Sequence, residues 1–114
     1  MIVKNIAKLS IGEETLVAHL RAYQIPFERE FQFHAVRKWR VDFLIGKNIA
    51  VEVEGGGSNG MVGRHQSRQG FQNDCVKYNR LAIMGYTLLR YTTADVKNGI
   101  AIAEIQEALA RGAA

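Results

Sequence analysis

The chain has 114 residues, of which 47% are hydrophobic and 23% are charged, and its formal net charge is +4. This size leaves room for one domain with one core, and the composition excludes a disordered tail, a collagen and a disulfide-stapled mini-protein. No apolar run approaches the roughly 20 residues that span a bilayer, and the first residues lack the apolar stretch of a signal peptide. The single cysteine, Cys75, cannot form an internal disulfide. We therefore expect a cytoplasmic protein without a membrane partner.

Basic residues are concentrated in the middle of the chain. Residues 34–90 contain nine lysines and arginines against four acids, a net charge of +5, whereas residues 1–33 are neutral overall. A basic surface alone points only weakly to a polyanionic partner, because many small basic proteins bind none. The positions of the few acids within this segment are therefore more informative than the charge itself.

The hydrophobic periodicity predicts one α/β domain with the order α-β-β-β-α-β-α. Ser10 and Glu13 have capping-box spacing before an amphipathic segment that Pro26 ends, and an extended segment opens at Phe27. Residues 55–70 contain six glycines and no hydrophobic period, so we expect a long mobile loop there. The expected helices are 11–24, a segment from Phe71 to the residues before Gly85, and 94–110, and the expected strands are 38–45, 48–54 and 86–91.

The strands on either side of the turn at Gly46 form a hairpin in which Ile45 lies opposite Ile49. The other face then brings Asp42 directly opposite Glu52, with Cβ atoms about 5 Å apart. Directly opposed like charges destabilise a hairpin, so a cation must compensate them. Alternation makes one face wholly apolar, and this core face carries Trp39, Val41, Phe43, Ile45, Ile49, Val51 and Val53.

Two kinds of cation could compensate the hairpin acids. Arg40 lies opposite Glu54 in this register and would neutralise one carboxylate of the three. Hard oxygen ligands with open positions for water and phosphate suit Mg²⁺ or Mn²⁺, and the basic surroundings would hold a phosphodiester over the metal. The alternative is a solvent-facing sheet surface whose acids and bases pair with one another. Three acids on one hairpin face within a basic segment favour the metal site.

The spacing of these acids resembles the PD-(D/E)XK nuclease superfamily, whose pattern is an Asp, some nine residues, and Glu-x-Lys on the next strand. Here Asp42 is followed, after nine residues, by Glu52-Val53-Glu54. The resemblance spans roughly residues 10–93. It implies a restriction-endonuclease-like core, with a mixed central sheet flanked by helices, and a single nuclease domain over residues 1–114.

The resemblance extends to the first helix, where many members of the superfamily carry a Glu. Glu13 matches this position best, as in Holliday-junction resolvases and very-short-patch-repair-like nucleases, whereas the adjacent Glu14 points about 100° away. The alternative role of Glu13 is helix capping.

The motif lysine is replaced by Glu54, a substitution that the very-short-patch-like relatives share. Glu54 could be a further metal or water ligand. The role of the lysine could pass to Lys77 on the second helix, whose simpler role is an ion pair with Asp74 one turn away. His65 in the glycine-rich loop is a third candidate, as an acid, a base or a phosphate contact.

We therefore predict a Mg²⁺- or Mn²⁺-dependent DNA endonuclease without an organic cofactor. The resemblance and the small size favour either a homodimer or a structure-selective substrate such as a branched junction. Compactness and the lack of targeting signals suit a bacterial or phage enzyme. The alternatives are a nucleic-acid-binding module that lacks catalysis and a protein-interaction domain that binds an acidic partner. The expected catalytic residues are Glu13, Asp42, Glu52, Glu54 and Lys77, the metal ligands are Asp42, Glu52 and the Val53 carbonyl, and the DNA-binding residues are Arg37, Lys38, Arg40, Arg64, His65 and Arg68.

Overall fold

The structure, a computed structural model, describes residues 10–54 and 68–112. These residues form one α/β domain with a four-stranded mixed sheet, as predicted. The glycine-rich loop was predicted over 55–70, and residues 55–67 lie outside the described ranges. The elements in chain order are helix α2 (Ile11–Ala22), strands β1 (Phe27–Gln32), β2 (Arg40–Ile45) and β3 (Ile49–Glu54), helix α4 (Arg68–Ile83), strand β4 (Thr87–Thr92), and helices α5 (Thr93–Lys97) and α6 (Ile100–Ala110).

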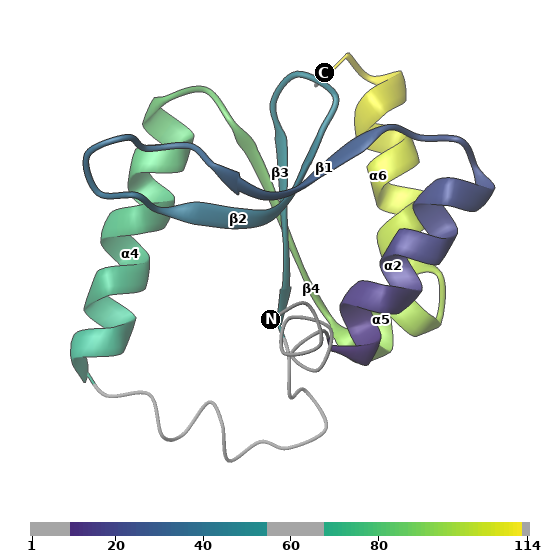
Figure 1. The fold of residues 1–114 in the computed structure, drawn as a ribbon, viewed down its shortest axis with the longest axis horizontal. Helices are drawn as coiled ribbons and strands as arrows, with labels where there is room; N and C mark the ends of the chain where they lie inside the picture. The colour runs from purple at the N-terminus through teal and green to yellow at the C-terminus, as the bar shows by residue number, and fades with distance from the viewer. Residues whose placement is uncertain (1–9, 55–67, 113–114) are drawn as a thin grey trace, which may run out of the picture.

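The strands lie in the order β1-β2-β3-β4. β1 pairs antiparallel with β2, β2 pairs antiparallel with β3, and β3 pairs parallel with β4 after the chain has passed through α4. The predicted register of the hairpin is confirmed, because Ile45 is the partner of Ile49. Figure 1 shows α4 on one side of the strands and α2, α5 and α6 on the other.

Helix α2 begins at the predicted residue and ends two residues early. The hydroxyl of Ser10 accepts the N–H of Glu13 at 3.0 Å and caps the first turn. Leu16 and Leu20, one turn apart, are fully buried against the sheet. The helix ends because the chain turns at Gln24, which has a φ of 57°, before Pro26.

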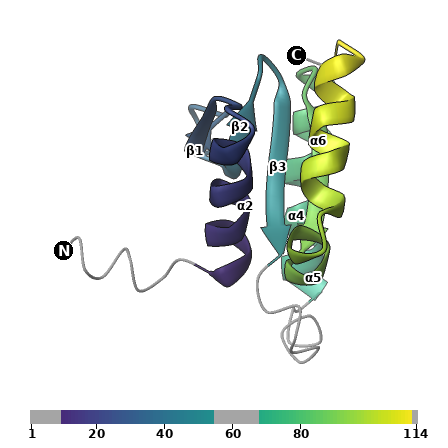
Figure 2. The same cartoon turned by 90° about the vertical axis from the view of Figure 1, so that its right-hand side faces the viewer.

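The larger core lies between the sheet and the helices α2, α5 and α6 (Figure 2). As alternation predicted, it contains five apolar residues of the hairpin, Phe43, Ile45, Ile49, Val51 and Val53. Tyr91 from β4 and Ile105 from α6 complete it. Burial of this apolar surface is the main source of stability for the domain, at about 25 cal/mol per Å² removed from water.

A smaller core lies under α4 and consists of Phe33, Val41, Ala50 and Leu81. Trp39 and Val41 were predicted on the same core face as Phe43, but Val41 is buried in this smaller cluster and Trp39 packs, half-buried, against it. The apolar pattern of α4 was also wrong in part, because Phe71 is 67% exposed and Leu81 is the one buried residue of the helix. In addition, the helix already begins at Arg68, so residues 68–70 are helical and do not belong to a loop.

The last predicted helix, 94–110, is two helices in the structure. Helix α5 ends at Lys97, and Gly99 follows with a φ of 89°, a left-handed conformation that favours glycine. The chain then changes direction and starts α6, whose Ala101, Ile102 and Ile105 enter the larger core. Among the described residues, we find no helix of the length and apolarity that a membrane span requires.

Candidate active site

The candidate site lies where β2 and β3 separate. Main-chain pairing between the two strands covers Ile45–Ile49, Leu44–Ala50 and Phe43–Val51, and the ladder ends there. Beyond that point β3 continues beside β4, with Glu52 opposite Arg90, while β2 continues beside β1 (Figure 1). The separation leaves main-chain groups of both strands to be bonded by side chains.

The side chains of Asp42 and Glu52 take over these bonds. Asp42 Oδ2 accepts the main-chain N–H of Val53 at 2.8 Å, and Glu52 Oε2 accepts the main-chain N–H of Asp42 at 3.1 Å. The predicted direct cross-strand pair is therefore wrong in detail, since the ladder stops one residue earlier. The two carboxylates remain neighbours, and each one bonds the opposite strand.

Glu13 reaches the same place from the first turn of α2. Gly12 lets the helix approach β3 closely, because a Cβ atom there would lie 2.9 Å from Val53 Cγ1 and 2.8 Å from Thr93 Oγ1. Ser10 caps the helix through the N–H of Glu13, and the Glu13 carboxylate itself turns to Arg29, with a distance of 2.8 Å between Oε1 and Nη2. The main chain of Glu13 thus serves the cap while its side chain faces the sheet.

Glu30, on β1, is a member of the site that sequence reasoning missed. It lies at the position of β1 opposite Asp42, between the paired residues Arg29 and Phe31, and its φ is 51°. A left-handed conformation inside a strand is unusual for a residue with a side chain. Because alternation makes Glu30 an ordinary exposed strand residue, the sequence carries no signal for this position.

Glu13, Glu30 and Asp42 form a carboxylate cluster. One oxygen of each lies within 4.8 Å of the others. Ligands on opposite sides of Mg²⁺ are about 4.2 Å apart, so small side-chain movements would let the three share one cation. Arg29 pairs with Glu13, but Asp42 and Glu30 have no ion pair within residues 10–54 and 68–112. The cluster therefore has an excess of negative charge and the hard oxygen donors that a divalent cation needs.

The electrostatics of Asp42 reflect this crowding. The pKa of its carboxyl is raised to about 7, mainly by burial and also by the carboxylates of Glu52, Glu13 and Glu30, against the opposing effect of the Val53 N–H. A bound cation would reverse this effect, because an adjacent positive charge favours the ionised carboxylate.

Glu52 has a different environment, provided by α4. Lys77 Nζ lies 3.7 Å from Glu52 Oε1, and the hydroxyl of Tyr78 donates to the same oxygen at 3.1 Å. Burial raises the pKa of Glu52, while Lys77, Tyr78 and the Asp42 N–H lower it. The alternative partner of Lys77, Asp74, forms no ion pair with it in the described part of the chain. The motif acid is thus held in place by a cation and a hydroxyl.

Glu54, at the end of β3, lies outside the carboxylate cluster. Its carboxylate pairs with Arg90 of β4, with 2.9 Å between Oε2 and Nε. The predicted pairing of Glu54 with Arg40 is wrong, because β2 has left β3 by then and Arg40 lies opposite Gln32 on β1. Val53 contributes its N–H to Asp42, and a metal-ligand role for its carbonyl stays a prediction.

The predicted DNA-binding residues that the structure describes are exposed. Arg37 and Lys38 lie in the connection between β1 and β2, Arg40 opens β2, and Arg68 opens α4. Arg64 and His65 lie outside the described residues. Arg37, Lys38 and Arg40 therefore precede Asp42 by only a few residues in the sequence.

The comparisons with known proteins bear on the fold. The catalytic domain of the homing endonuclease I-Bth0305I is similar in structure, with a TM-score of 0.60 over 88% of this chain and 93% of that one. The two sequences are 18% identical over the match. No protein-family model and no curated protein sequence matches the chain. The chain is thus similar in fold to this catalytic domain, and membership of the PD-(D/E)XK superfamily and of its resolvase branch stays a prediction.

Proposed function

We propose that this protein is a metal-dependent DNA endonuclease that hydrolyses phosphodiester bonds. The observation that carries the proposal is the carboxylate cluster, together with Glu52 and Lys77, at the point where the central strands separate. The similarity in fold to a homing endonuclease catalytic domain supports it. Asp42 and Glu30 have no ion-pair partner in the described ranges, so a cation among the three carboxylates of the cluster would offset their repulsion.

Each side chain has a role in this proposal. Asp42 would hold Mg²⁺ or Mn²⁺ together with Glu13, Glu30 and Glu52. A cation bound there lowers the pKa of water and stabilises negative charge on the phosphoryl oxygens. Lys77, 3.7 Å from Glu52, would neutralise the phosphate in place of the motif lysine that Glu54 replaces.

The substrate and the assembly are finer parts of the proposal. A domain of this size covers little DNA, which favours a homodimer or a substrate with an unusual shape such as a four-way junction. The exposed Arg37, Lys38 and Arg40 would contact backbone phosphates, which position DNA without reading its sequence. The resemblance to Holliday-junction resolvases supports the choice of junction DNA.

The test is a cleavage assay with four-way-junction, nicked, mismatched and linear duplex DNA side by side. Each substrate is incubated in Mg²⁺, in Mn²⁺ and in EDTA. We expect metal-dependent cleavage, and paired symmetric cuts in the junction alone would identify a dimeric resolvase. Tight binding without cleavage of any substrate would contradict the proposal and would favour the non-catalytic module. The loss of activity would then be explained by Glu54, which replaces the motif lysine.

A further inference from the structure

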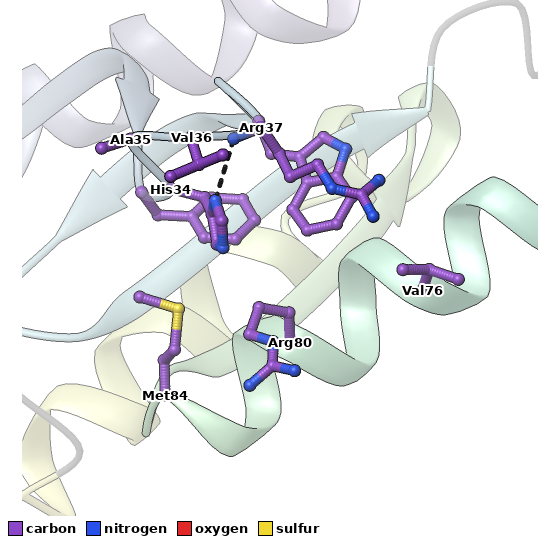
Figure 3. A pocket seen from close by; sticks show the side chains of 9 residues that line it. His34, Ala35, Val36, Arg37, Val76, Arg80 and Met84 are labelled. Atoms are coloured by element: carbon purple, nitrogen blue, oxygen red, sulfur yellow. Dashed lines mark hydrogen bonds between the residues drawn. The ribbon is translucent and has the colours of Figure 1, made fainter.

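A pocket with a volume of about 540 Å³ lies between the β1–β2 connection and the last turns of α4 (Figure 3). This volume is in the range of roughly 300–1,000 Å³ that is usual for small-molecule sites. The pocket shares α4 with the candidate active site, since Arg80 lines it one turn after Lys77. It contains none of the proposed metal ligands.

The charge of the pocket is positive and has no counterion in the described structure. Arg37 from the connection and Arg80 from α4 both line it, and no Asp or Glu does. Neither arginine forms an ion pair with any residue of the described ranges. Two guanidinium groups without carboxylate partners suit an anionic group, and their planar donors match phosphate oxygens.

The wall beneath the cations is aromatic. Trp39 stacks on Phe33, with ring centroids 6.1 Å apart and an interplanar angle of 25°. The guanidinium carbon of Arg37 lies 5.0 Å from the centre of the Trp39 ring. Apolar side chains extend the wall to the rim, where Val36 is 85% exposed and Met84 is 45% exposed. Planar cationic and aromatic surfaces of this kind stack with nucleobases.

His34 adds a directed hydrogen-bond donor. Its Nδ1 accepts the main-chain N–H of Arg37 at 3.0 Å, so the ring proton of the neutral imidazole lies on Nε2. Figure 3 shows the second ring nitrogen pointing across the pocket toward Met84 and Arg80 on α4. A donor in this position can reach a carbonyl or ring nitrogen on the edge of a base.

We propose that this pocket binds one unstacked nucleotide of a DNA strand, with its base on the guanidinium of Arg37, which itself lies over Trp39, and its phosphate at Arg80. A fully stacked duplex cannot supply such a ligand, because its base faces are covered. The inference rests on the proposed nuclease function and names its substrate class as DNA with an unpaired or extruded nucleotide.

The position of the pocket relates the nucleotide to the site of cleavage. Trp39 precedes Asp42 by three residues of nearly continuous strand, which is about 10 Å at about 3.3 Å per residue. This distance equals the rise of about three nucleotides in one DNA strand. We therefore expect a cut about three nucleotides from the unpaired position.

The test uses Trp39, the single tryptophan of the chain, as a fluorescent reporter in the pocket. The protein is titrated in EDTA with a perfect short duplex and with the same duplex carrying one bulged adenine. We expect about tenfold tighter binding of the bulged duplex, as one stacked base contributes, with quenching of Trp39. Arg80→Ala should remove this preference and leave the affinity for the perfect duplex unchanged. Arg21→Ala, which replaces an exposed arginine of α2, is the matched control and should change neither affinity.

Three results would overturn the inference. Equal affinity for both duplexes without a change in Trp39 emission would show that the pocket takes no base. Loss of affinity for both duplexes in Arg80→Ala would reduce the arginine to a general phosphate contact. Quenching by polyglutamate as strong as by bulged DNA would assign the pocket to an acidic protein segment. Metal-dependent cleavage in the same preparation is read separately, so the proposed nuclease function can survive any of these results.

Discussion

Next to its turn, the β2–β3 hairpin has regular main-chain pairing, and Phe43, Ile45, Ile49 and Val51 are completely buried. A single residue further along, the strands part, and carboxylates of Asp42 and Glu52 bond the main chain that the ladder no longer satisfies. Both halves follow the same alternating pattern. The half beside the turn gains stability from burial, whereas the separated half keeps partly buried acids whose pKa values are raised. Under the proposed function, the partly buried acids of the separated half would serve the metal site at a cost in stability.

Removing the carboxylate of Asp42 is the most severe test of the separated half of the hairpin. Asp42→Asn keeps an oxygen that can accept the Val53 N–H but removes the charge that would bind a cation. We expect cleavage to fall by about a thousandfold or more, equivalent to about 4 kcal/mol of transition-state stabilisation, with DNA binding intact. Cleavage assays and gel-shift titrations measure the two effects. Asp95→Asn in α5 is the matched control, and normal cutting by Asp42→Asn would refute the assignment.

Truncating a buried side chain in the half of the hairpin beside the turn should lower stability without a direct effect on catalysis. Ile45 is fully buried, so Ile45→Ala should lower the free energy of unfolding by about 2–5 kcal/mol. Urea denaturation followed by circular dichroism measures this change. Ile11→Ala, at a side chain that is 66% exposed, should stay within about 0.5 kcal/mol of the original protein. Equal effects of the two substitutions would contradict the described core.

Glu30 tests the part of the site that lies outside the hairpin. Glu30→Gln removes one of the three negative charges of the carboxylate cluster and should weaken Mn²⁺ binding by about tenfold. Glu107→Gln, on the exposed surface of α6, should leave the Mn²⁺ affinity unchanged. Isothermal titration calorimetry of both variants provides the comparison. If Glu30→Gln binds Mn²⁺ as tightly as the original protein, Glu30 is not a ligand.

The pH dependence of stability should also separate the two halves. The pKa of Asp42 is about 7 in the folded, metal-free protein and 3.8 in the unfolded chain. Between these pH values the folded state holds a proton that the unfolded state has lost, so raising the pH favours unfolding. We expect the Tm in EDTA to fall between about pH 4 and pH 7, and Asp42→Asn to flatten this slope. A Tm that rises through this range would contradict the raised pKa.

The sequence predicted the hairpin well because its information is local. Alternating apolar residues and the turn at Gly46 specify the register, and the register brings Asp42 near Glu52. The end of the β2–β3 ladder after the Phe43–Val51 pair could not be predicted. It depends on the pairing of β3 with β4 and on the pairing of β2 with β1.

The parts that sequence reasoning missed depend on tertiary packing. Glu30 lies beside Asp42 with a left-handed φ, and no residue pattern in the sequence predicts that conformation. For Lys77 the sequence left open an ion pair with Asp74 and the role of the motif lysine, and its contact with Glu52 depends on how α4 packs in the folded domain. Gly99 could have indicated the break between α5 and α6, because a glycine within a helical pattern is a frequent stop signal.

The central claim is that the carboxylates around Asp42 bind a divalent cation, and calorimetric titration with Mn²⁺ tests it most directly. The titration is carried out above pH 7, where the carboxyl of Asp42 is mostly ionised. We expect saturable binding to the original protein and to Asp95→Asn, and its loss in Asp42→Asn. The absence of saturable binding, or equal binding by Asp42→Asn, would contradict the claim.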